Sequence, residues 1–124
     1  IKGGNSNWRG PIWLPTNYLL LESLKKFSQV FGNTLRISLE GESEISLEEM
    51  ISVFSSGLIS LFLPDTEGKR PFLGSKFPMI NDPHFKDQLL FYEFYNGDTG
   101  QGLGASHQTG WSGLVANLID ELRK

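Results

Sequence analysis

The sequence predicts a mainly α-helical protein whose helices are joined by long, ordered loops. Three stretches, at 16–31, 46–62 and 111–122, space their apolar residues as one face of an α-helix requires. The segments between them are rich in Pro and Gly, yet they keep large apolar side chains that need burial. This combination is typical of a helical scaffold that carries a site at the ends of its helices.

Composition excludes several functional classes. The 124 residues suffice for one domain with a modest core, and their net charge of -3 includes no basic stripe, so nucleic acid is not an expected partner. No run approaches the roughly 20 apolar residues of a membrane span, so a membrane is not expected either. Cysteine is absent, the two histidines lack a third ligand at suitable spacing, and no phosphate or dinucleotide fingerprint occurs. Neither a metal nor a cofactor is therefore expected.

The first two helices have recognisable ends. Thr16 is expected to cap the first helix, Gly32 to end it, and its apolar residues to be buried on most sides. Ser46 and Glu49 form a capping box at the start of the second helix, and Pro64 stops it. Between the two helices, alternating apolar residues in 33–45 fit one short strand or hairpin.

The second half of the chain is more irregular. Residues 64–88 contain several Pro and Gly but also buried-type residues, which predicts an ordered loop in which Asp82 caps a short turn. Residues 89–95 alternate as an extended segment would, and a glycine-rich loop at 100–104 follows. We expect this loop to let the backbone approach a ligand closely.

Glu93 is the best catalytic candidate. It lies within a block of large apolar and aromatic residues, where burying a lone carboxylate costs several kcal/mol unless it is paired. Arg9, between two Trp residues of the first loop, is the natural partner, because its planar guanidinium can hold a carboxylate or sugar hydroxyls. A purely structural Arg–Glu tie between the two ends of the chain is an equal alternative.

Other side chains could line a sugar site around Glu93. Indole rings can serve as platforms for pyranose rings, and Tyr or Asn can bond hydroxyl groups, although each of these residues could equally be a core or loop residue. His107, in the loop after Glu93, can line the same pocket. The candidate substrate-binding residues are Trp8, Arg9, Trp13, Asn17, Tyr92, His107 and Trp111.

Two ordered sets of motifs resemble glycoside hydrolase family 63. The run Trp8-Arg9-Gly10-Pro11-Ile12-Trp13 is similar to the Trp-Arg-Gly-Pro signature of that family. A second set of motifs resembles the C-terminal catalytic block of the family. It consists of Glu93-Phe94-Tyr95-Asn96, Thr99-Gly100 and Gly110-Trp111-Ser112-Gly113-Leu114-Val115. Because the motifs occur at both ends and in the right order, the resemblance covers nearly the whole chain.

The resemblance implies an inverting glycosidase acting on α-glucosides, with residues 1–124 forming the C-terminal portion of one (α/α)6 barrel. Glu93 matches the general base of the family. The aspartate that serves as general acid has no counterpart motif here, so the chain by itself is expected to be inactive and to need the remaining N-terminal part of the catalytic domain. Without that part, exposed helix faces favour self-association. The alternatives are a non-catalytic carbohydrate-binding piece and a structural helical domain, and the cellular compartment stays open.

Overall fold

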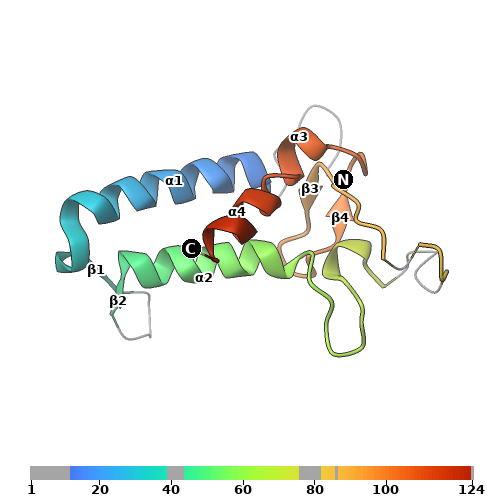
Figure 1. The fold of residues 1–124 in the computed structure, drawn as a ribbon, viewed down its shortest axis with the longest axis horizontal. Coiled ribbons are helices and arrows are strands. Elements are labelled where there is room, and N and C mark those ends of the chain that lie inside the picture. The colour runs from blue at the N-terminus through green and yellow to red at the C-terminus, as the bar shows by residue number, and fades with distance from the viewer. Residues whose placement is uncertain (1–11, 39–43, 76–81, 86, 124) are drawn as a thin grey trace.

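The structure is a computed structural model, and it describes residues 1–124 except 1–11, 39–43, 76–81, 86 and 124. Two long helices, α1 (Leu14–Phe31) and α2 (Leu47–Ser60), lie side by side and run in opposite directions (Figure 1). A shorter helix, α4 (Val115–Glu121), packs against α2. The predicted mainly α character is therefore confirmed.

Helix α1 begins two residues earlier than the sequence predicts. Its N-cap residue is Trp13 and not Thr16, and Pro15 occupies the first turn, where its fixed φ and missing N–H are tolerated. The helix ends as expected at Gly32, whose φ of 54° lies in the left-handed region that favours glycine. The Thr16 cap is wrong because proline starts the helix before the hydroxyl residue is reached.

A short hairpin joins the two long helices. After the 3₁₀ turn η2 (Gly32–Thr34), strand β1 (Arg36–Ile37) pairs antiparallel with β2 (Ile45–Ser46), which confirms the expected hairpin in a shorter form. The capping box of α2 is also confirmed. The Glu49 N–H donates to Ser46 Oγ at 3.1 Å, and the Ser46 N–H donates to Glu49 Oε2 at 2.7 Å. Hydrogen bonds from Ser46, helped by the charge of Arg36, lower the pKa of Glu49.

The long link after α2 is ordered wherever the structure describes it. Its 3₁₀ turn η3 (Pro71–Leu73) buries Phe72 fully, and the Phe72 ring packs at 5.6 Å from that of Phe62. Asp82 caps a turn as predicted, since its Oδ1 accepts a hydrogen bond from the His84 N–H at 2.8 Å. Strand β3 (Phe94–Tyr95) then pairs antiparallel with β4 (Gly102–Leu103).

The predicted C-terminal helix is divided into two. Helix α3 (Thr109–Ser112) ends at Gly113, and α4 starts at Val115. Ser112 is fully buried and donates a hydrogen bond to the Tyr92 carbonyl, which ties α3 to the segment before β3. Glycine at 113 lowers the cost of interrupting the helix there. The prediction of one continuous helix over 111–122 was therefore wrong, and the contact of Ser112 with Tyr92 is one that the helical spacing does not reveal.

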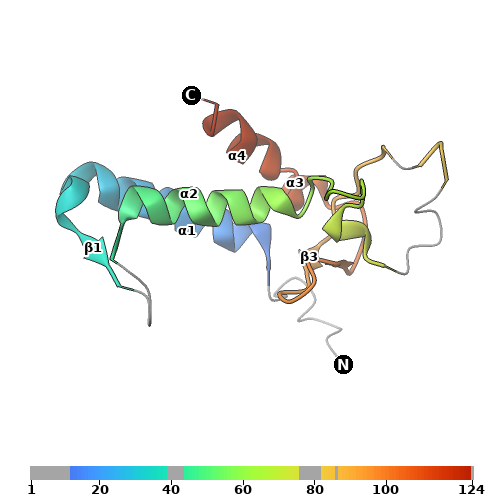
Figure 2. The same ribbon diagram turned by 90° about the horizontal axis from the view of Figure 1, so that it is seen from below.

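The core lies where the helices meet the β3–β4 hairpin. It is built from fully or almost fully buried residues of α1, α2, the turn after α2, η3, β3 and α4: Leu14, Leu21, Leu58, Ile59, Leu61, Phe62, Phe72, Leu73, Tyr95, Val115 and Leu118. Residues far apart in the sequence thus meet at the end of the molecule that carries β3, β4 and α3 (Figure 2).

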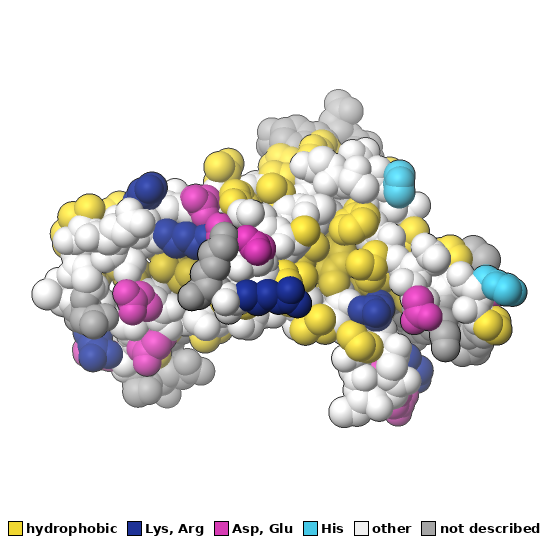
Figure 3. All heavy atoms as spheres, in the orientation of Figure 1, with side chains coloured by type: hydrophobic (Ala, Val, Ile, Leu, Met, Phe, Trp, Pro, Cys, Tyr) yellow, Lys and Arg dark blue, Asp and Glu magenta, His cyan; other side chains and the backbone are white. Residues whose placement is uncertain are grey.

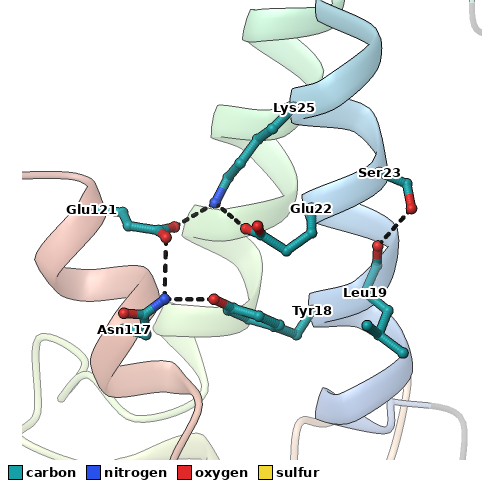
Figure 4. A network of polar contacts seen from close by, with 7 residues as sticks. All are labelled: Tyr18, Leu19, Glu22, Ser23, Lys25, Asn117 and Glu121. Atoms are coloured by element: carbon teal, nitrogen blue, oxygen red, sulfur yellow. Dashed lines mark hydrogen bonds and ion pairs between the residues drawn. The ribbon is translucent and has the colours of Figure 1, made fainter.

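A polar network joins α1 to α4 beside this core. Lys25 forms ion pairs with Glu22 at 2.8 Å and with Glu121, while Asn117 donates to both Glu121 and the Tyr18 hydroxyl (Figure 4). Burial lowers the pKa of Lys25, but hydrogen bonds and charges of the two glutamates outweigh burial and raise that pKa. The network holds the C-terminal helix against the first one.

The outer side of α1 is apolar and exposed. Leu19 is 67% exposed, Phe27 53% and Val30 76%, and Figure 3 shows hydrophobic side chains at the surface along α1 and around the β3–β4 end. The prediction that α1 is buried on most sides is therefore wrong, because among the described residues its contacts with α2 and α3 leave these apolar side chains exposed. Among the described residues, no helix combines the length and the hydropathy needed to cross a membrane.

Candidate functional site

Glu93 lies immediately before β3. It is held by the backbone of Ala105, which follows β4, the strand that pairs with β3. Its N–H donates to the Ala105 carbonyl at 2.9 Å, and its Oε2 accepts from the Ala105 N–H at 3.1 Å. The side chain is half-buried, so the carboxylate is not enclosed among aromatic rings as its sequence neighbours suggested. No Lys or Arg in the described ranges forms an ion pair with it.

The glycine-rich loop accommodates protein side chains in the described structure. A Cβ atom at Gly104, where φ is 76°, would lie 2.1 Å from Glu93 Oε2. A Cβ atom at Gly102 would lie 2.1 Å from Cδ2 of the Tyr92 ring. Both distances are far below van der Waals contact, so glycine at these positions makes room for Glu93 and Tyr92. The sequence analysis foresaw a close backbone approach, but it assigned the approach to a ligand.

The end of the first loop reaches the segment that contains Glu93. Ile12 and Tyr95 form an antiparallel bridge, in which the Ile12 N–H donates to the Tyr95 carbonyl at 3.1 Å and the reverse bond measures 2.9 Å. Trp13, the next residue, makes an edge-to-face contact with Trp111 at a centroid separation of 5.6 Å. Two of the predicted indole rings therefore meet, one from each of the two motif sets.

His107 and Tyr92 flank the same segment. Phe91 and His107 form a parallel bridge, and the Gln108 N–H donates to the Phe91 carbonyl at 2.6 Å. The His107 side chain is exposed, whereas the Tyr92 side chain is half-buried, and burial raises the pKa of Tyr92. The structure thus gathers the predicted residues Trp13, Tyr92, Glu93, His107 and Trp111 around the β3–β4 hairpin and α3 (Figure 1).

Tyr95 is the buried anchor behind the site. Its side chain is fully buried, and burial raises the pKa of Tyr95 to about 12. Ser112 and the backbone of Tyr92 oppose this rise, although the hydroxyl has no partner of hydrogen-bond geometry among the described residues. The segment that contains Glu93 is therefore anchored in the hydrophobic core by the buried Tyr95 side chain.

Of the remaining predicted site residues, one stabilises a helix and two are not described by the structure. Both the backbone N–H and the side-chain amide of Asn17 donate to the Trp13 carbonyl, at 3.1 and 2.9 Å, so Asn17 stabilises the first turn of α1. Trp8 and Arg9 lie outside the described residues. Sequence reasoning missed Gly104 and Ala105 as contacts of Glu93, and the spacing of the glycine-rich loop was the one signal that pointed toward them.

A groove of about 690 Å³ lies away from Glu93, between the link after α2 and the turn before β4. Its three charged residues are already engaged within the protein. Asp65 Oδ1 accepts from two backbone N–H groups, Lys69 pairs with Glu67, and Arg70 donates to the Phe62 carbonyl. Because these charged groups already have partners, we place the functional site at Glu93 and not in this groove. In the described ranges, no three His, Asp or Glu side chains converge as metal ligands would.

The structure thus shows a helical chain in which a backbone N–H holds the Glu93 carboxylate and two indole rings are in contact, and comparison with known proteins relates this chain to glucosidases. The chain is 26% identical, over 90% of its length, to mannosyl-oligosaccharide glucosidase of Saccharomyces cerevisiae. It is 25% identical, over 95% of its length, to a probable mannosyl-oligosaccharide glucosidase of Schizosaccharomyces pombe. The resemblance to glycoside hydrolase family 63, which includes mannosyl-oligosaccharide glucosidase, is therefore confirmed as distant homology over most of the chain.

A further relative shares more residues but has no assigned role. Over 97% of its length, the chain is 43% identical to an uncharacterized protein of Saccharomyces cerevisiae. The chain spans only 11% of the length of each of these three relatives. No family model matches the chain, and no solved structure matches it.

Proposed function

We propose that the chain is a C-terminal part of the catalytic domain of an inverting α-glycosidase, in which Glu93 is the general base. The observation that carries this proposal is the state of the Glu93 side chain, which is partly exposed and is held through Oε2 by a backbone N–H. A carboxylate that is fixed in direction and still reachable by solvent is what activation of a water molecule requires.

In the proposed reaction, Glu93 removes a proton from water while the water oxygen attacks the anomeric carbon. The glycosidic C–O bond breaks with inversion, and a protonated aspartate transfers its proton to the leaving oxygen. In inverting enzymes the two carboxyl groups lie about 6.5–9.5 Å apart, so that the water fits between the base and the sugar. That aspartate lies outside this chain, and the substrates are α-linked glucosides.

The aromatic residues beside Glu93 give the proposed substrate its platform. Trp111 is half-buried and contacts Trp13 edge to face, which leaves part of its indole available to the apolar face of a pyranose. In this proposal Tyr92 and His107 bond sugar hydroxyls. Trp8 and Arg9 join this set because they share the Trp8–Trp13 sequence motif with Trp13.

The proposed domain is an (α/α)6 barrel, of which residues 1–124 supply one portion. Support comes from the antiparallel pair of α1 and α2 and from the apolar outer side of α1, which needs a covering helix layer. We assign that layer to the remaining N-terminal part of the catalytic domain. The barrel would bring the general acid opposite Glu93.

The test is Glu93→Gln in the full-length enzyme, assayed with α-glucosides. Loss of a general base typically lowers kcat about 10²–10⁴-fold, whereas quenching of Trp fluorescence by the sugar should persist. Glu48→Gln is the matched control, because Glu48 is exposed in the first turn of α2, at the end of that helix remote from β3. Unchanged turnover in Glu93→Gln would remove Glu93 from this role, and the chain would then be a carbohydrate-binding piece. Absence of any sugar-dependent quenching would favour a structural helical domain.

A further inference from the structure

We propose that Gly104 and Ala105 act as positioning residues that select Oε1 of Glu93 as the oxygen that accepts the proton from water. The proposal rests on the proposed function, since it concerns how the general base is aimed. It arises from two contacts that join Glu93 to the loop after β4.

Ala105 holds Glu93 in two places. Its carbonyl accepts from the Glu93 N–H at 2.9 Å, which fixes the backbone, and its N–H donates to Oε2 at 3.1 Å, which fixes the carboxylate. With main chain and side chain bound to one residue, the intervening side-chain torsions are restrained. Oε2 is thereby engaged, and Oε1 has no partner among the described residues.

Gly104 provides the space that this arrangement needs. A Cβ atom there would lie 2.1 Å from Oε2 and 3.0 Å from both Cβ and Cδ of Glu93. The φ of 76° is also a conformation that other residues adopt only with strain. Any side chain at position 104 would therefore push the carboxylate away from the Ala105 N–H.

Displacement of the carboxylate has a specific kinetic consequence. The base must lie within hydrogen-bond reach of the water, and a shift of about 1 Å can cost about 10²-fold in rate. Substrate binding depends chiefly on aromatic and hydroxyl-bonding groups, which a change at Gly104 leaves in place. The effect should therefore fall on kcat and not on KM.

The experiment compares Gly104→Ala with Gly68→Ala in the full-length enzyme. Gly68 is an unusually close control, because its φ is 77° and a Cβ atom there would meet no heavy atom within 4 Å. Both changes therefore carry the same backbone strain, and only Gly104→Ala collides with Glu93. We expect kcat to fall about 10–100-fold in Gly104→Ala with KM changed less than about threefold, and both parameters to stay near wild type in Gly68→Ala.

A second measurement separates positioning from loss of folding. In the wild-type background, Gly104→Ala should lower the thermal midpoint more than Gly68→Ala does. In a Glu93→Gly background, where the whole Glu93 side chain including its Cβ atom is absent, the two glycine substitutions should lower it equally. This holds even where Gly104→Ala alone fails to fold, since Glu93→Gly should then restore folding of the double variant.

The outcomes distinguish this inference from the proposed function. Equal kcat values for the Gly104→Ala and Gly68→Ala variants, with activity abolished by Glu93→Gln, would overturn the positioning role and leave the general base intact. Retained turnover in Glu93→Gln would overturn the general base itself. An excess loss of stability in Gly104→Ala that survives in the Glu93→Gly background would show that the contact with Glu93 is not what Gly104 serves.

Discussion

Replacing Tyr95 by Phe tests whether burial of the Tyr95 hydroxyl makes the stability of the protein depend on pH. The Tyr95 side chain is fully buried, and burial raises its pKa from the ordinary tyrosine value of 10.0 to about 12. A group whose pKa is raised by folding contributes its full stability below the unfolded value and loses it as pH rises through the folded value. The window for this loss is therefore pH 10 to 12.

The magnitude follows from the two pKa values. A difference of about two units corresponds to about 2.7 kcal/mol, of which about 1.4 kcal/mol should already be lost at pH 11. The Tyr95→Phe variant cannot ionise at this position, so it should not show that part of the loss. At pH 8 the variant should differ from wild type by less than about 1 kcal/mol, because the hydroxyl has no hydrogen-bond partner among the described residues.

The assay is urea unfolding at pH 8 and pH 11, with the free energy of unfolding extrapolated to water. Lys25 and Tyr92 also titrate at alkaline pH, but they are present in both proteins and cancel in the comparison. Tyr18→Phe is the control, since it leaves Tyr95 intact and should keep the Tyr95 contribution. Equal losses in the wild-type and Tyr95→Phe proteins between the two pH values would refute the assignment of this buried hydroxyl.

Two further predictions concern the helices. Ser46→Ala should lower the free energy of unfolding by about 1 kcal/mol, because it removes the acceptor of the Glu49 N–H, whereas Ser60→Ala, at an exposed hydroxyl near the end of α2, should change it by less than about 0.5 kcal/mol. Equal effects in the two variants, measured by urea unfolding, would contradict the capping role. The 124-residue chain should self-associate through the exposed apolar side of α1, and Val30→Lys should weaken that association. A monomer at high concentration in size-exclusion chromatography would contradict the prediction that the apolar side of α1 must be covered by other helices.

Local signals in the sequence predicted the secondary structure well where they were strong. The capping box at Ser46, the end of α1 at Gly32 and the turn at Asp82 are all present in the structure, because each depends on residues adjacent in the chain. Other predictions failed. The Thr16 cap failed because Pro15 starts α1 earlier, and spacing alone predicted one helix over 111–122, where the structure has α3 and α4 and a buried hydrogen bond from Ser112 to Tyr92.

The same division applies to the candidate site. Glu93, Tyr92 and Trp111 could be singled out from residue type and motif, since a carboxylate among aromatic residues is chemically conspicuous. Their surroundings could not be predicted in the same way. Whether Glu93 is enclosed or half-exposed depends on the path of the loop at 100–105, and that path is set by contacts across the hairpin.

By itself, the sequence determined the mainly helical class, the end of α1 at Gly32, the capped start of α2 and the identity of the catalytic candidate, because these depend on local chemistry and motif order. Only the tertiary structure decided that Ile12 pairs with Tyr95, that Trp13 meets Trp111 and that Ala105 holds Glu93. These contacts join residues that are far apart in the chain or lie on opposite strands. Their geometry follows from how the hairpin, α1 and α3 pack together, which no local pattern encodes.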